Sequence, residues 1–229
     1  MRGSEKFKGL KNAARFEFGY EKSKNKVYNL MLSWRSDYYP KNNIHSFIIL
    51  EYQNEYQSNY DKKNVIVNKG FGHLRITKYL IPKLGFEFFS QLGFNDFLMI
   101  NKRTLIGSGI RIKLFDTESI YIFSGSGFMH EDESYDFENQ INKSTIRSTS
   151  YSTLDLKIIN NVYLKSTIYF QPSFNDFKDF RMLIDNNLNV KLSKNFIMGL
   201  VIKFRFDNEP HGDLGKSYIQ INNGFELNF

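Results

Sequence analysis

From residue 11 onward, hydrophobic and polar side chains alternate along most of the sequence, a pattern typical of β-strands with two different faces. In residues 195–207 (NFIMGLVIKFRFD), every second position is large and apolar, and Gly, Lys, Arg and Asp stand between them. A soluble β-sandwich also alternates. Here, however, the polar face carries charges in nearly every segment, which favours a wall with lipid outside and a polar lumen inside.

The alternation predicts about twelve strands, each long enough for the roughly 9–11 tilted residues that cross a bilayer. They are expected at 11–20, 27–38, 43–56, 64–79, 83–95, 102–115, 119–131, 144–158, 162–172, 179–192, 195–207 and 217–229. The predicted fold is all-β: an antiparallel up-and-down transmembrane β-barrel over residues 11–229, preceded by a periplasmic segment, 1–10. A lipocalin-type cup, with about eight strands and an apolar interior, is the second choice.

The connections between these strands predict the orientation of the barrel. The even-numbered turns are all short, whereas the odd-numbered ones include 57–64, 132–143 and 208–216. Outer-membrane barrels have short periplasmic turns and longer outer loops, so both termini are expected in the periplasm of a bacterial outer membrane. Residues 132–143 should form an acidic outer loop, since they contain Asp132, Glu133, Asp136 and Glu138.

Composition narrows the function. The chain has no cysteine, which excludes disulfides and thiolate metal sites, and we predict neither a metal nor a cofactor. The net charge of +7 does not indicate nucleic acid, because basic and acidic residues alternate and form no continuous basic track. The start, MRGSEKFKGL, lacks the apolar core of a secretory signal, so for an outer-membrane barrel we expect the native signal to be missing here: either Met1 is not the native start or the native start lies upstream.

The last residues, NNGFELNF, have a specific pattern of polar, glycine, hydrophobic and terminal aromatic positions: Asn222, Gly224, Leu227 and Phe229. This pattern resembles the terminal insertion signal of outer-membrane barrels, which implies the barrel assembly machinery as a partner. An exposed apolar edge strand is normally an aggregation hazard, and it is tolerable when such machinery receives it.

Several segments resemble the YdiY-like salt-induced outer-membrane protein family, domain of unknown function 481, in its Bacteroidota form. They are HLRITKYL at 73–80, FEFFSQLGFNDF at 86–97, RTLIGSGIRIKLF at 103–115, MHEDESYD at 129–136, Arg147 with SYSTL at 150–154, and YFQPSFNDFKDFR at 169–181. The first three strands match weakly. The resemblance implies a barrel in the outer membrane and transfers no reaction.

The inward parity places charges of both signs on nearly every strand. Pairing the strands about their turns predicts a lumen charge network of Arg75 with Glu87 and Arg111, Arg103 with Glu131, Lys165 with Asp185, and Asp185 and Arg181 facing Lys203 and Asp207. A barrel of this size is roughly 24 Å across, so long charged side chains could fill most of it. Gly107, Gly109, Gly125 and Gly127 also point inward, and they either open space on one wall or make room for bulky neighbours.

A filled lumen favours a structural or partner-binding barrel, or a narrow pore of unknown substrate; an oligosaccharide or anion porin is the alternative. Lipid and lipopolysaccharide are the expected surroundings. The outward parity of strands six to eight holds six serines, the serine patch: Ser108, Ser124, Ser126, Ser148, Ser150 and Ser152. Small polar residues let membrane-embedded surfaces approach closely, so the patch is a candidate interface with a second copy or a membrane-protein partner. The competing interpretation is a parity slip that turns these serines inward.

An enzyme is a less favoured reading, and no catalytic residue is assigned. His130 stands at the outer end of its strand, across the hairpin from Ser148 and Ser150. A lipase needs such a pair oriented by a third group, and the sequence indicates none.

Overall fold

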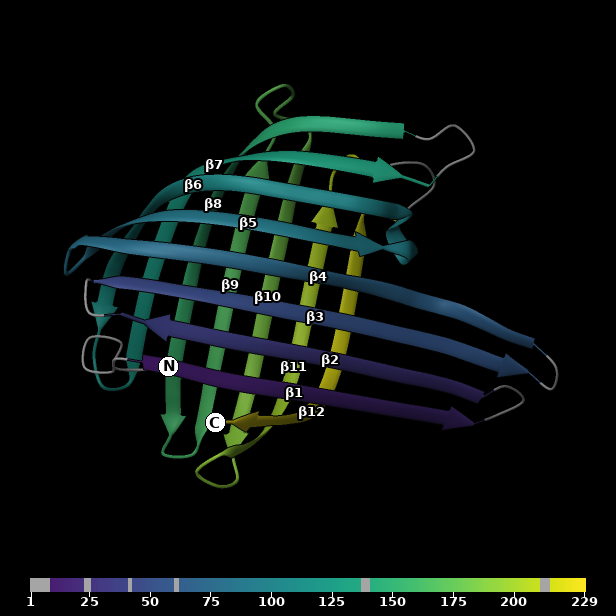
Figure 1. The fold of residues 1–229 in the computed structure, drawn as a ribbon, viewed down its shortest axis with the longest axis horizontal. Coiled ribbons are helices and arrows are strands. Elements are labelled where there is room, and N and C mark those ends of the chain that lie inside the picture. Colours follow the sequence, from purple (N-terminus) through teal and green to yellow (C-terminus); the bar gives the residue numbers. More distant parts are fainter. Residues whose placement is uncertain (1–8, 23–25, 41–42, 60–61, 137–140, 211–214) are drawn as a thin grey trace.

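The computed structural model describes residues 9–22, 26–40, 43–59, 62–136, 141–210 and 215–229, and arranges twelve antiparallel strands in one closed barrel (Figure 1). The strands are β1 (Gly9–Lys22), β2 (Lys26–Tyr39), β3 (Ile44–Asn59), β4 (Lys62–Ile81), β5 (Leu84–Asn95), β6 (Ile100–Asp116), β7 (Ile120–Tyr135), β8 (Ile141–Ile159), β9 (Val162–Pro172), β10 (Phe180–Lys191), β11 (Phe196–Asp207) and β12 (Ser217–Asn228). Each strand pairs with its neighbours in sequence, and β1 pairs with β12. The predicted twelve-strand up-and-down barrel is confirmed.

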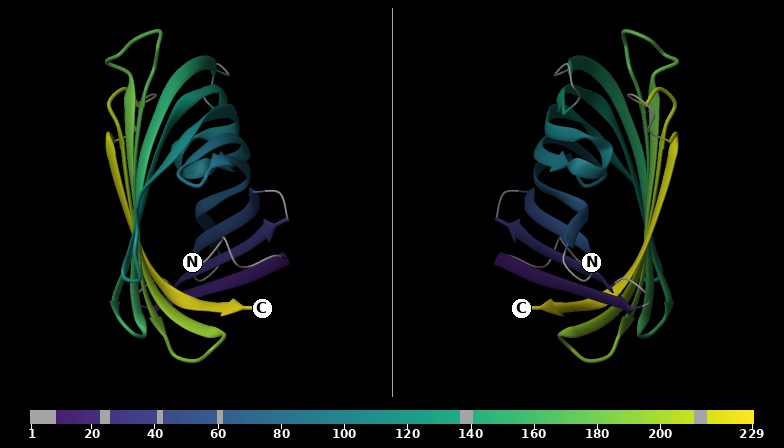
Figure 2. Two further views of the ribbon diagram at one scale, coloured as in Figure 1. Left: turned by 90° about the vertical axis from the view of Figure 1, so that its left-hand side faces the viewer. Right: turned by 90° about the vertical axis from the view of Figure 1, so that its right-hand side faces the viewer.

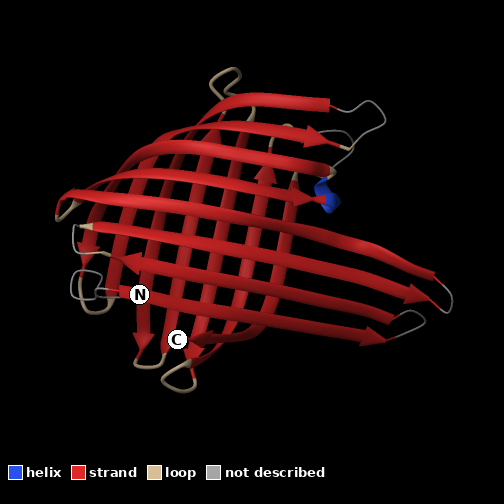
Figure 3. Ribbon diagram, viewed as in Figure 1, coloured by secondary structure: helices blue, strands red, loops and turns tan. Residues whose placement is uncertain are grey.

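The predicted strands all form, and the differences lie at their ends. The bounds expected for the loops 57–64 and 132–143 are wrong. β3 continues to Asn59 and β4 begins at Lys62, and β7 continues to Tyr135 and β8 begins at Ile141. β1 begins at Gly9, and residues 1–8 of the predicted N-terminal segment lie outside the described residues. Among the described residues, the helical content is the short 3₁₀ turn η1 (Asp96–Leu98), blue in Figure 3. None of the described helices has the length and hydropathy to span a membrane.

The barrel wall separates an apolar outer face from a polar inner face. On β7, Phe128 points outward and is 61% exposed, whereas the next residue, Met129, is 2% exposed, and Glu131 is 1% exposed. Exposed Phe, Leu and Ile side chains recur on the outer face of every strand from β1 to β12. Figure 2 shows the two facing walls of the barrel, one coloured purple to teal and the other green to yellow. An apolar outer face suits contact with hydrocarbon. The closed pairing of the strands also leaves few backbone groups unsatisfied there.

The seam between β1 and β12 is the shortest in the barrel. Within the described residues it contains four residue pairs, from Ala13 with Asn228 to Phe16 with Phe225, against nine at the next shortest seam, between β8 and β9. Backbone hydrogen bonds of 2.9 and 3.0 Å between Asn12 and Phe229 extend it by one position.

Gly224 marks the point where this pairing stops. A Cβ atom at Gly224 would lie 2.6 Å from the carbonyl oxygen of Phe16 and 3.2 Å from Cβ of Glu17. The first of these neighbours is backbone and cannot rotate away. The glycine of the predicted insertion signal therefore also has a packing role in the finished barrel, where it lets β1 lie close to β12.

We expect Gly224→Leu to reduce barrel closure even when the protein is refolded in detergent without any assembly machinery. Gly19→Ala is the control: Gly19 also lies on β1 but outside the β1–β12 seam, opposite Asn29 on β2, and a Cβ there would meet Cβ of Asn29 at 3.4 Å, an ordinary contact. The folded fraction is measured by heat-modifiable gel migration. If Gly224→Leu closes as well as the wild type in detergent, this glycine has no packing role.

Candidate functional site in the lumen

The lumen at the end of the barrel opposite the two chain termini holds a network of four cations and four anions, which we call the eight-charge network. Its members are Arg103, Glu131, Glu133, Lys143, Arg147, Asp179, Arg181 and Asp207. They come from β6, β7, β8, β10 and β11 and from the loop between β9 and β10. Equal numbers of the two signs let this part of the lumen be filled without a net charge.

Glu131 is the centre of the network. Its carboxylate accepts hydrogen bonds from Arg103, from Arg147 Nε at 2.6 Å and from Arg181 Nη1 at 2.7 Å. These three arginines belong to three different strands, β6, β8 and β10. A carboxylate this deeply buried is tolerated only when its charge is compensated and its lone pairs are occupied, as they are here.

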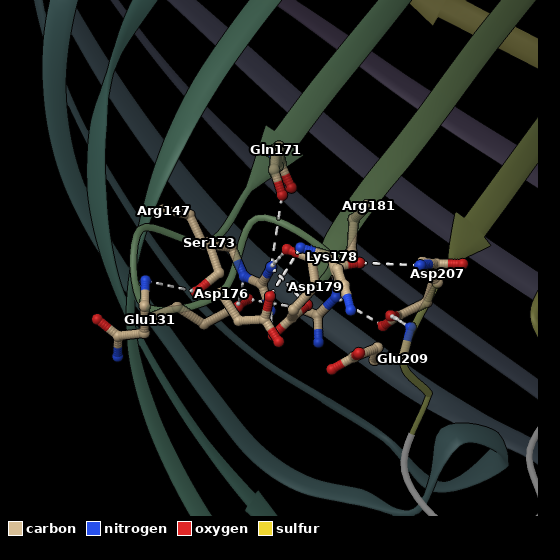
Figure 4. Close-up of polar contacts among 12 residues, drawn as sticks. Glu131, Arg147, Gln171, Ser173, Asp176, Lys178, Asp179, Arg181, Asp207 and Glu209 are labelled. Carbon is tan, nitrogen blue, oxygen red and sulfur yellow. Dashed lines mark hydrogen bonds and ion pairs between the residues drawn. The ribbon is translucent and has the colours of Figure 1, made fainter.

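Arg147 is fully buried and fastens the β9–β10 loop to the wall (Figure 4). Its guanidinium donates two hydrogen bonds to the Asp179 carboxylate, at 2.9 and 3.1 Å, in a bidentate arrangement. Lys143 Nζ lies 2.7 Å from the same carboxylate. Burial acts to raise the pKa of Asp179, but the hydrogen bonds from Arg147 and Lys143 outweigh it and hold this pKa below its usual range.

Arg181 joins strands that are not neighbours in the wall. It donates from Nη1 and Nη2 to Glu133 on β7, at 3.0 and 2.9 Å. Its Nε donates to Asp207 on β11 at 2.8 Å (Figure 4). Since β8 and β9 separate β7 from β10, the Arg181–Glu133 contact spans the lumen rather than running along the wall. The eight-charge network therefore occupies part of the lumen as well as lining its wall.

A second cluster surrounds Glu87 in the middle of the barrel. Its carboxylate accepts hydrogen bonds from Thr77 at 3.0 Å and from Tyr151, and it lies 3.0 Å from Arg111 and 3.6 Å from Arg75. Tyr151 belongs to β8, so this cluster also bridges strands that are not adjacent.

Two of the inward glycines, Gly107 on β6 and Gly125 on β7, make room for aromatic rings and do not leave open space. A Cβ at Gly107 would meet the ring of Phe89, and a Cβ at Gly125 would meet the ring of Tyr151. The Arg111 guanidinium lies 4.0 Å from the centroid of the Phe123 ring, in a cation–π contact. Of the two interpretations offered by the sequence, the bulky-neighbour interpretation holds at Gly107 and Gly125.

Polar contacts also cross the lumen beside β12. Lys203 on β11 lies 2.6 Å from Glu51 on β3. Lys69 on β4 donates to Gln220 on β12 at 2.9 Å, and Gln220 donates to Gln53 on β3 at 2.8 Å. These contacts join the two facing walls seen in Figure 2.

The structure brings together several of the predicted lumen pairs. Arg75, Glu87 and Arg111 meet, as do Arg103 with Glu131 and Arg181 with Asp207. The sequence reasoning missed Glu133 and Asp179. Glu133 had been assigned to an acidic outer loop but lies on β7 and faces inward, and Asp179 stands in a loop whose fold no alternation reports.

One predicted pair, Lys165 with Asp185, is wrong, and Asp185 and Lys203 face each other as predicted without forming an ion pair. Lys165 lies 3.8 Å from Asp155 on β8, not against Asp185, because β9 and β10 pair two residues away from the assumed register. Asp185 does face Lys203 in the backbone register, but its ion pair is with Arg205, at 2.7 Å. Lys203 instead reaches across to Glu51, because a long side chain is not bound to its cross-strand neighbour.

The serine patch faces outward, so the parity slip is excluded. Ser126 bonds to Ser150 and Ser124 to Ser152, each at 3.0 Å. Ser108 does not pair with Ser126. Its partner on β7 is Phe128, and Phe128 pairs on its other side with Ser148. The paired hydroxyls already have hydrogen-bond partners within the wall, so lipid can cover them, and the interface remains a prediction.

The structure also gives the positions of His130 and of the residues in the predicted insertion signal. The predicted position of His130 opposite Ser148 and Ser150 is wrong: its cross-strand partner is Ile146, and its Nε2 lies 3.0 Å from Oγ of Ser144. Leu227 and Phe229 of the predicted insertion signal are outward and half exposed. Asn222 turns inward, 3.2 Å from the sulfur of Met31.

The family can now be stated from the sequence. A family model described as "Protein of unknown function, DUF481" matches residues 55–229. The chain belongs to the DUF481 family. This match begins within β3, which agrees with the weak resemblance of the first strands. No curated protein matches this DUF481 chain.

Solved structures share the barrel fold of this DUF481 protein at low sequence identity. The translocator domain of the autotransporter NalP from Neisseria meningitidis matches with a TM-score of 0.60 and 9% identity, over 99% of this chain and 90% of that one. A bacterial polysaccharide outer membrane secretin matches with a TM-score of 0.48 and 9% identity, over 96% and 97%. The KdgM porin in complex with disordered oligogalacturonate gives 0.47 and 9%, over 96% and 99%. At such identities the NalP likeness shows the fold alone.

We expect Arg147→Met to lower the stability of the barrel by about 3–5 kcal/mol, since it removes the bidentate partner of Asp179 and one of the three arginines that bind Glu131. Lys165→Met is the matched control: that lysine is 44% exposed and 3.8 Å from Asp155, so the loss should stay below about 1 kcal/mol. Thermal unfolding in detergent measures both. Equal losses would show that burial of the pair does not decide its contribution.

The lowered pKa of Asp179 predicts a loop that loosens in acid. The stabilisation is complete above the usual aspartate pKa of about 4 and is lost as the pH falls through the lower pKa of the folded state. Hydrogen exchange in 173–179, corrected for intrinsic rates, should therefore rise as the pH falls below about 4. Asp179→Asn should exchange fast already at neutral pH, and pH-independent protection in the wild type would contradict the assignment.

Proposed function

We propose that this chain is a barrel of the bacterial outer membrane whose lumen is closed by its own side chains, and that it acts as a structural or partner-binding barrel. The observation that carries the proposal is the plug: the contacts of Arg181 with Glu133, of Tyr151 with Glu87 and of Lys203 with Glu51 each join strands separated by others. Buried, mutually paired charges leave little free polar surface for a passing solute.

The apolar outer face and the fold shared with NalP support the membrane location. The 173–179 connection, the longest whose residues are all described, lies at the end opposite the termini, which supports termini in the periplasm. In that orientation the eight-charge network is near the cell surface, and the assembly machinery would recognise the C-terminal strand. A YdiY-like role in the Bacteroidota is part of this proposal.

Partners would approach through the outer wall, which meets lipid and lipopolysaccharide. The serine patch is the candidate contact, because its small side chains let a second membrane-embedded surface approach β6, β7 and β8 closely. The lumen residues described above are assigned no catalytic role.

We expect the purified wild-type barrel to be electrically silent in a planar lipid bilayer. Replacing Arg147 and Arg181 together with alanine removes two of the four cations of the eight-charge network and leaves its four carboxylates. Discrete, cation-selective conductance steps should therefore appear. Lys165→Ala, outside the plug, should stay silent. Heat-modifiable migration confirms that each variant is folded, and discrete conductance of the wild type would instead favour an oligosaccharide or anion porin.

A further inference from the structure

The outer end of the β7–β8 hairpin carries a serine, a histidine and an aspartate in one hydrogen-bonded row on the outward face. Ser144 Oγ lies 3.0 Å from Nε2 of His130, and Nδ1 of the same ring lies 3.3 Å from Oδ2 of Asp132. The two ring nitrogens thus face different partners. This is the division of roles in serine hydrolases, where one nitrogen takes the hydroxyl proton and the other is held by a carboxylate.

The order of the three residues follows from the strand geometry. Asp132 and Ser144 are direct cross-strand partners, and His130 is two residues before Asp132 on the same face of β7. Alternation keeps all three outside the barrel, apart from the eight-charge network within. His130 and Asp132 are about half exposed, so a substrate in the surrounding membrane can reach them.

The outward face changes character at His130. Its cross-strand neighbours are Ile106 and Ile146, and Phe128 lies two residues before it; all three are exposed and apolar. One step further toward the rim, Asp132 stands between Thr104 and Ser144. The histidine is therefore at the border between the apolar belt and the polar rim, the depth at which the ester bonds of membrane lipids lie.

An apolar shelf continues beside this border. The Phe128 ring lies 5.5 Å from Phe174, and Phe174 lies 6.3 Å from Phe177, measured between centroids. Phe177 is 71% exposed. The backbone N–H of Phe174 donates to the carbonyl of Ile146, which fixes the loop against β8. Acyl chains would pack on these rings.

We propose that Ser144, His130 and Asp132 form a serine hydrolase site on the outer surface of the barrel, which cleaves carboxylic esters of acyl lipids in the adjoining leaflet. The ester occurs both in glycerophospholipids and in the lipid part of lipopolysaccharide, and the same chemistry would act on either. This activity is separate from the closed lumen proposed above.

The step balances without a cofactor. Ser144 Oγ attacks the carbonyl carbon while its proton passes to His130 Nε2, and the Nδ1–H donated to Asp132 stabilises the imidazolium. Asn142, two residues before Ser144 on the same face, supplies an amide donor for the oxyanion. The C–O bond breaks, the alcohol leaves with the Nε2 proton, and water then releases the acid from Ser144 by the reverse transfers.

The test uses the full chain folded in detergent, with folding checked by heat-modifiable migration. A fluorophosphonate probe reports the nucleophile, and fatty-acid release is followed from phosphatidylethanolamine–phosphatidylglycerol vesicles and, in a second arm, from lipopolysaccharide. The wild type should be labelled and should release acid in at least one arm, which identifies the lipid. Ser144→Ala should abolish both signals, and Asp132→Asn should slow release about 10²–10⁴-fold.

Ser166→Ala is the matched control, since Ser166 is a serine on the outward parity of β9, between Leu154 and Asn186 and away from His130. It should keep full labelling and release. A folded wild type that is neither labelled nor active in either arm would overturn the proposal. So would labelling that survives Ser144→Ala. Neither result bears on whether the lumen conducts, so the closed-barrel proposal is tested separately.

Discussion

Three arginine side chains converge on the carboxylate of Glu131, and the organisation of the eight-charge network depends on that convergence. Within the apolar belt of the outer face, charged side chains have their place on the inside, and there each must find an opposite charge, because an unpaired buried ion is costly. Glu131 satisfies this requirement for Arg103, Arg147 and Arg181 at once. Through Arg147 it also positions the β9–β10 loop, since the same guanidinium binds Asp179.

The sequence predicted the wall well because alternation reports it directly. A residue's parity follows from one strand alone, so inward Arg75, Glu87 and Arg111 were found together. Pairing partners depend in addition on register. A shift of two residues keeps every side chain on its face but exchanges its neighbour, which is why Lys165 was assigned to Asp185 rather than to Asp155.

Contacts that cross the lumen could not be predicted from neighbouring strands. Lys203 and Glu51 lie on β11 and β3, and only the closed barrel brings them together. The outer Ser144–His130–Asp132 row was missed for a local reason. Diagonal neighbours on both sides of His130 include serines, and sequence alone does not show toward which serine the ring turns.

The brief pairing of β1 with β12 has a consequence for how the molecule is made and undone. Every other seam joins strands that follow each other in the chain, so each can form as a local hairpin. The β1–β12 seam alone joins the two ends of the polypeptide, and it therefore bears the largest loss of chain entropy while offering four residue pairs in return. We therefore expect the β1–β12 seam to form last when the barrel closes and to open first when it unfolds.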